Sequence, residues 1–147
     1  MSEAQQLSAQ YEELQEEVQE LQQVVAQLEA TIQGCENAKE TLENVDDGDE
    51  ILVPLGGETK IRATVESVDE VLVGVGADVT VELDEEDAVE SLEDKIDGLE
   101  ETKRETEAKL EDRQEQIEEL AQRAQQMQME QQRQQQRGGG RGHPEGE

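Results

Sequence analysis

Two heptad series of apolar residues run through the first third of the chain and constrain its fold more than any other feature. One series contains Leu7, Leu14, Leu21, Leu28, Cys35 and Leu42. The companion series, displaced by four positions, contains Tyr11, Val18, Val25 and Ile32, and Lys39 is its one break. This spacing lets a helix bury one stripe of side chains against another helix. Residues 1–46 are therefore predicted to form an N-terminal coiled-coil helix.

A second pair of heptad series occupies residues 85–130. One contains Val89, Ile96, Lys103, Leu110, Ile117 and Ala124, and the other contains Leu92, Leu99, Thr106, Arg113, Leu120 and Met127. Polar residues interrupt this stripe at Lys103, Thr106 and Arg113, which weakens a coiled coil but can fix its register. The acidic residues 84–87 suit a helix N-terminus. Because the two helical segments have similar lengths, we expect them to fold back on each other as an antiparallel pair.

The intervening residues 47–84 are predicted to form two β-hairpins, because apolar and polar residues alternate there. In the second hairpin, a three-residue loop at Gly76-Ala77-Asp78 would oppose Val75 with Val79, Val73 with Val81, and Val71 with Leu83. Asp78 would then take a left-handed conformation. Residues 131–147 are rich in Gln and Gly and are predicted to be a disordered tail. The expected fold class is α+β, a long antiparallel coiled-coil helical hairpin with two central β-hairpins.

The chain is strongly acidic, with 40 acidic and 12 basic residues among 147 and a net charge of −28. Such a chain should repel nucleic acid and anionic membrane surfaces, so neither is an expected partner. Adaptation to a salt-rich cytoplasm would explain the charge, and a solvated Glu-rich helix surface is the alternative. No apolar stretch approaches the roughly 20 residues of a membrane span. With no signal peptide and a lone Cys35, we expect a cytoplasmic protein.

The sequence offers no enzyme chemistry, and no catalytic residue, cofactor or metal site is expected. No Gly-rich phosphate loop follows a strand. His143 has no neighbouring Cys or His, and Cys35 occupies a seam position that suits packing. The acidic run 46–50 lacks the spacing of a calcium loop and is interpreted as a solvated turn.

Two sets of apolar residues are predicted to bind other proteins. In the antiparallel arrangement, the first set meets at the helix ends, where either simple seam packing or binding of other proteins would explain it. Its members are Leu7, Tyr11, Leu14, Leu120, Ala124, Met127 and Met129. The second set lies on the hairpins, which are marginal alone and need partner strands. Its members are Ile51, Val53, Ile61, Val65, Val71, Val73, Val75, Val79 and Val81.

The order helix, two hairpins, helix resembles the archaeal prefoldin α subunit across residues 1 to about 130. "EILVPLGG" is similar to the first-strand motif of that family, and "VLVGVGADVTVEL" to its second hairpin. This sequence has Asp78 and Val79 where the family pattern has Gly and an aromatic residue. The resemblance implies a hexamer of two α and four β subunits, whose hairpins build an oligomeric β-barrel body.

The resemblance also implies an ATP-independent holdase that captures unfolded client proteins and delivers them to a group II chaperonin. The acidic bias would place it in a halophilic archaeon. A structural coiled-coil adaptor that tethers specific partners is the alternative. A third hypothesis, RNA association through Arg137–Gly142, depends on one short Arg-Gly tract without an aromatic residue.

Overall fold

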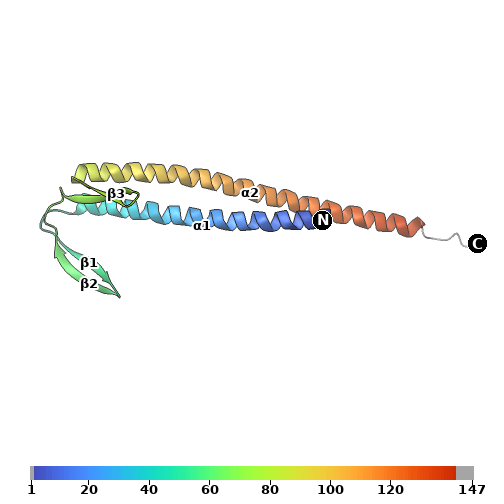
Figure 1. The fold of residues 1–147 in the computed structure, drawn as a ribbon, viewed down its shortest axis with the longest axis horizontal. Helices are drawn as coiled ribbons and strands as arrows, with labels where there is room; N and C mark the ends of the chain where they lie inside the picture. Colours follow the sequence, from blue (N-terminus) through green and yellow to red (C-terminus); the bar gives the residue numbers. More distant parts are fainter. Residues whose placement is uncertain (1, 142–147) are drawn as a thin grey trace, which may run out of the picture. The chain divides into compact units, whose positions relative to one another are not determined.

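The computed structural model describes residues 2–141, with side chains as far as residue 137. Two long helices flank four strands in the order α1 (Glu3–Asn44), β1 (Glu50–Gly56), β2 (Thr59–Thr64), β3 (Val71–Gly76), β4 (Val79–Leu83) and α2 (Glu85–Arg141) (Figure 1). The strands form two separate two-stranded sheets, β1-β2 and β3-β4. This confirms the predicted α+β class with two helices around two hairpins.

Both helices begin with side-chain caps. At α1, the Ser2 hydroxyl oxygen accepts a hydrogen bond from the backbone amide of Gln5. The Gln5 side-chain oxygen accepts one from the backbone amide of Ser2, and both donor–acceptor distances are 3.2 Å. At α2, Asp84 Oδ1 accepts the amide of Asp87 at 2.8 Å. These contacts satisfy amides that have no partner within the first turn of a helix. The acidic run before the second heptad region therefore marks the helix start, as the sequence predicted.

The end of α2 differs from the prediction. The helix continues to Arg141, whereas the sequence predicted a helix that ends at residue 130 and a disordered tail from residue 131. Residues 131–137 consist of Gln and Arg, which have high helix propensity, and the polarity that suggested disorder does not oppose a solvated helix. Residues 142–147 of the predicted tail, His143 included, lie outside the described residues.

The chain divides into two compact units, which we describe separately. The terminal unit contains Met1–Val25 and Glu105–Glu147, and the hairpin unit contains Ala26–Arg104. Within each unit a part of α1 runs antiparallel beside a part of α2 (Figure 1).

Seam residues form the core of the hairpin unit. Cys35 of α1 packs with Leu92 and Ile96 of α2, and each of the three side chains is at most 8% exposed. Ile32, Leu42 and Leu99 pack around them. Each buried aliphatic side chain stabilises the pair by about 1.5–3 kcal/mol, so a few heptad positions hold the helices together. Cys35 thus packs as a small apolar residue, as its heptad position indicated.

Both hairpins use the same turn geometry. In each, a bulged residue (Leu55 or Val75) precedes a glycine with positive φ, and two further residues with positive φ form the turn. Positive φ at both turn residues is the type I′ pattern, whose twist matches that of paired strands. The turns are Gly57-Glu58 in the first hairpin and Ala77-Asp78 in the second.

The predicted register of the second hairpin is correct at two pairs and wrong at the third. Val71 opposes Leu83 and Val73 opposes Val81, but Gly76, not Val75, opposes Val79. The predicted three-residue loop is therefore a two-residue turn, and Val75 is the extra residue of a bulge. Apolar alternation does not reveal such a bulge, which reconciles a short turn with the apolar pairs. Asp78 has φ 59°, as predicted.

Replacing the turn Ala77-Asp78 by Asn-Gly should stabilise the second hairpin. Ala77 has φ 49° and Asp78 has φ 59°, a region that costs most L-residues roughly 1–2 kcal/mol and that Asn and Gly adopt more readily. We expect amide hydrogen exchange in β3 and β4 to slow by about fivefold, the equivalent of about 1 kcal/mol.

The opposite change provides the control. Gly76→Ala places a side chain at φ 110° and should accelerate the same exchange. Unchanged exchange in the Asn-Gly variant would contradict the assigned turn.

Candidate binding surfaces

An apolar groove of about 510 Å³ lies between α1 and α2 in the terminal unit. Five of the seven predicted end residues line it: Leu7, Tyr11, Leu120, Ala124 and Met127. Their exposure differs, because Leu120 is 8% exposed and forms the floor, whereas Tyr11 is 37% exposed. Some heptad residues of this unit are therefore buried between the helices, whereas others form an accessible apolar surface.

The other two predicted end residues lie elsewhere. Leu14 lines a neighbouring polar cavity together with Glu17 and Arg113. Met129 is 61% exposed and does not line the groove. The groove also includes Ala4 and Ala121, which the sequence analysis missed. Ala4 could have been found, because it lies seven residues before Tyr11 and continues the companion heptad series.

Basic residues that interrupt the heptad series form ion pairs across the helices. In the hairpin unit, Lys39 Nζ lies 3.0 Å from Glu93 Oε1, and Lys103 Nζ lies 3.4 Å from Glu29 Oε1. The two α1 residues, Lys39 and Glu29, are ten positions apart, and their α2 partners are ten positions apart in the opposite direction, as antiparallel packing requires. These half-exposed pairs add little stability but disfavour other registers, because a shifted register would place Lys39 against apolar seam residues.

The terminal unit contains a third cross-helix pair. Arg113 Nε lies 2.7 Å from Glu17 Oε2, and the Arg113 guanidinium also contacts Asp112. Arg113 is one of the residues that interrupt the second heptad region. The guanidinium replaces an apolar seam residue and donates hydrogen bonds to two carboxylates.

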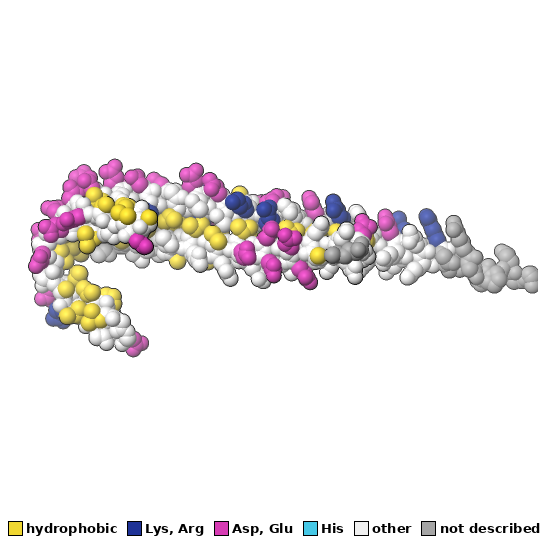
Figure 2. All heavy atoms as spheres, in the orientation of Figure 1, with side chains coloured by type: hydrophobic (Ala, Val, Ile, Leu, Met, Phe, Trp, Pro, Cys, Tyr) yellow, Lys and Arg dark blue, Asp and Glu magenta, His cyan; other side chains and the backbone are white. Residues whose placement is uncertain are grey.

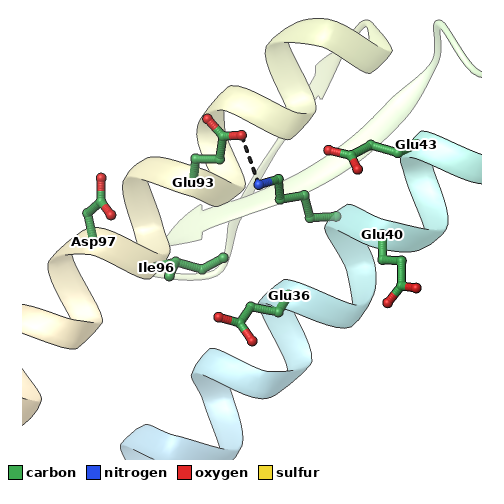
Figure 3. A pocket seen from close by; sticks show the side chains of 7 residues that line it. Glu36, Glu40, Glu43, Glu93, Ile96 and Asp97 are labelled. Carbon is green, nitrogen blue, oxygen red and sulfur yellow. Dashed lines mark ion pairs between the residues drawn. The ribbon is translucent and has the colours of Figure 1, made fainter.

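Lys39 lies in a strongly acidic cavity of about 480 Å³ in the hairpin unit (Figure 3). The other lining residues are Glu36, Glu40, Glu43, Glu93, Ile96 and Asp97. The hydrogen bond to Glu93, followed by the charge of that carboxylate, raises the pKa of Lys39 above its ordinary value of 10.5. Because the pKa of Lys39 is higher in the folded than in the unfolded state, its interaction with Glu93 stabilises the fold fully at pH values below the unfolded-state pKa. This contribution is lost as the pH rises through the folded-state pKa. The pair is therefore intact at neutral pH.

The nine predicted assembly residues do not form one surface. Val73 is 7% exposed and, with Val71, shares an open cavity of about 450 Å³ with Leu42 of α1 and Leu92 of α2. By contrast, Ile61, Val75 and Val79 are each more than half exposed. Val73 is thus already buried within its own chain, whereas the other three side chains are available to another chain.

The hairpins also expose large apolar residues that the sequence analysis did not assign to assembly. Leu52, Leu55 and Leu72 are 60–72% exposed. Leu52 opposes Arg62 and Leu72 opposes Glu82, so both lie on the faces that the alternation pattern treated as polar. Figure 2 shows apolar side chains gathered over the β1-β2 hairpin. A hairpin with apolar residues on both faces cannot be covered by a single layer.

The acidic turn before β1 is held by its own side chains. Asp49 Oδ2 accepts the amide of Asp46 at 2.9 Å, and Asp47 Oδ1 accepts the amide of Val68 at 2.7 Å. Among the described residues, no cluster of three or more His, Cys, Asp or Glu could hold a metal ion. In the same part of the chain, no helix has the length and apolar character needed to cross a membrane.

Comparison with known proteins identifies a family whose members are similar to this chain. The family model described as "Prefoldin subunit" matches residues 14–130. A prefoldin subunit alpha of Haloarcula marismortui is 40% identical over 81 residues, covering 50% of this chain and 53% of the relative. Another, from Halorubrum lacusprofundi, is 39% identical over 72 residues, covering 49% and 47%. The alignments thus span about half the length of these relatives.

A solved structure has a similar fold. It is a cryo-EM structure of filamentous PFD from Methanocaldococcus jannaschii, with a TM-score of 0.51 and 29% sequence identity. The alignment covers 82% of this chain and 98% of that one. The similarity therefore extends over most of this chain.

Proposed function

The chain belongs to the prefoldin family of chaperones, among the archaeal α subunits, and we propose that it is one subunit of an ATP-independent holdase. In this proposal, the apolar groove of the terminal unit captures unfolded proteins, and the hairpins join the chain to other subunits. The complex contains two α and four β subunits joined through a β-barrel body. It acts in the cytoplasm and transfers clients to a group II chaperonin.

The groove is the observation that carries the proposal. It leaves Leu7, Tyr11 and Met127 accessible, although these apolar side chains would be more stable when buried. Met is flexible and polarizable, so it adapts to differently shaped partners. The polar part of the lining consists of uncharged side chains, Ser8, Gln125, Gln128 and Gln131. A groove without charged groups suits many unfolded apolar segments and no particular folded one.

Weak binding by one groove is compatible with effective holding by the complex. Each apolar side chain contributes on the order of 1.5–3 kcal/mol when buried, and part of this is offset by ordering of the client. Several subunits that engage one unfolded chain would increase the affinity through effective concentration. Assembly is thus a functional requirement, and the exposed apolar residues of the hairpins support it.

The groove assignment predicts the effect of a triple substitution. Leu7→Gln, Tyr11→Gln and Met127→Gln remove the apolar surface while keeping a residue of good helix propensity. Together with the β subunits at molar salt, the variant should lose most suppression of client aggregation, measured by light scattering, and retain its hexameric mass.

Val24→Gln is the matched control, because Val24 is 41% exposed on α1 but does not line the groove. This variant should suppress aggregation as the unchanged chain does. Full suppression by the triple variant would refute the groove assignment. Binding of one folded partner without any aggregation suppression would instead support the adaptor alternative.

The assembly surface predicts different outcomes for two charged substitutions. Ile61→Glu changes a side chain that is 53% exposed in the single chain, so the chain should keep its helical circular dichroism but fail to form the hexamer. Val73→Glu introduces a charge at a buried position and should lower both helical stability and assembly. Light scattering that gives an unchanged hexameric mass for Ile61→Glu would contradict the role of this face.

A further inference from the structure

Met129 is not explained by seam packing or by the groove. It lies outside both heptad series of α2, its side chain is 61% exposed, and it does not line the apolar groove. The described side chains that follow it, from residue 130 to residue 137, are also exposed. This part of the terminal unit is therefore a solvated helix surface that carries one large apolar side chain.

Two arginines follow Met129 at helical spacing. Met129, Arg133 and Arg137 are separated by four residues each, so they lie along one face of α2. Neither arginine forms an ion pair with another described residue. We call Met129, Arg133 and Arg137 the arginine face.

The charge around the arginine face is opposite to that of the whole chain. Between residues 120 and 137, Glu130 is the only acidic residue, and three arginines are present, whereas the chain has a net charge of −28. Figure 2 shows dark blue side chains on this part of α2 and many magenta ones elsewhere. An unfolded acidic segment would thus meet little repulsion here and would meet it over most other surfaces.

We propose that the arginine face binds unfolded segments in which apolar residues alternate with Asp and Glu. The inference rests on the proposed client-holding function and specifies the class of client. Met129 contacts apolar side chains of the segment, and Arg133 and Arg137 each donate hydrogen bonds to its carboxylates. The apolar groove remains the site for apolar segments without regard to charge.

The chemistry of arginine suits this role at high salt. At about 1 M salt the Debye length is roughly 3 Å, so only charges in direct contact interact appreciably. A guanidinium can still form two parallel hydrogen bonds with one carboxylate, and it loses less hydration than a lysine ammonium. The basic residues of α2 beyond Lys109 are all arginines.

This chain itself contains a segment of the proposed client class. Residues 79–92, VTVELDEEDAVESL, combine Val and Leu with many carboxylates. A holdase with a purely acidic binding end would repel such clients whenever salt fell.

The test uses the assembled complex and two short fluorescent peptides with identical apolar residues, one with Glu and one with Lys at the alternating positions. Binding is measured by fluorescence anisotropy in about 1 M KCl. Arg133→Gln with Arg137→Gln removes both charges and keeps helix propensity. We expect affinity for the Glu peptide to fall about fourfold, since each of the two exposed pairs contributes a factor of about two, and affinity for the Lys peptide to remain unchanged.

Arg104→Gln with Lys109→Gln is the matched control, because both residues are exposed on α2 and the charge change is identical. This control should bind both peptides as the unchanged complex does. An equal loss in the control variant, or equal binding of both peptides by the unchanged complex, would overturn the inference. In either case, if the groove substitutions abolish peptide binding, the proposed function is still supported, because the groove then binds the peptides.

Two further outcomes separate the alternatives. If neither peptide binds and the complex fails to suppress aggregation, the proposed function itself is wrong. If a single-stranded RNA oligonucleotide binds and only its affinity depends on Arg133 and Arg137, the arginine face serves nucleic acid and the peptide inference is overturned.

Discussion

The packing of heptad stripes between α1 and α2 is the interaction on which the other features depend. In the hairpin unit, Cys35, Leu92 and Ile96 bury the apolar stripe of each helix against the other. In the terminal unit, Leu120 is buried and forms the floor of the groove. A chain without Phe or Trp has few large side chains with which to build a core. Most of its buried side chains therefore lie along the stripe where the two helices pack.

The same scarcity accounts for the exposed apolar residues. A narrow seam cannot cover the hairpin residues Leu55, Ile61 and Leu72, nor the side chains that line the groove. Contiguous exposed apolar surface is an aggregation hazard in a chain that acts alone. The proposed function resolves both cases, because partner subunits cover the hairpins and transient clients cover the groove. The high negative charge keeps such a chain soluble between encounters.

The sequence predicted the elements well because periodicity is a local signal. The heptad spacing identified both helices, and Asp84 identified the start of α2. The bulge at Val75 was missed because apolar alternation specifies which faces pair but not where an extra residue enters a strand. The helix beyond residue 130 was missed because a polar, Gln-rich composition is shared by solvated helices and disordered chains.

The surfaces were harder to predict than the elements. Heptad position cannot distinguish Leu120, which is buried, from Tyr11, which is exposed, because both lie on the seam. Likewise, Val73 and Val79 have similar sequence contexts, but only Val73 faces the helices of its own chain. Charge pairing across the seam, such as that between Lys39 and Glu93, depends on register, which a single heptad pattern leaves open.

Site-specific photocrosslinking tests the central claim that the groove holds unfolded protein. A photoactivatable residue is placed at position 127, which lines the groove, at position 24, which does not, or at position 61 of the first hairpin. Each is irradiated in the assembled complex with an unfolded client. The account predicts client adducts at position 127 and few or none at the other two. Adducts of similar yield at position 24, or mainly at position 61, would contradict it.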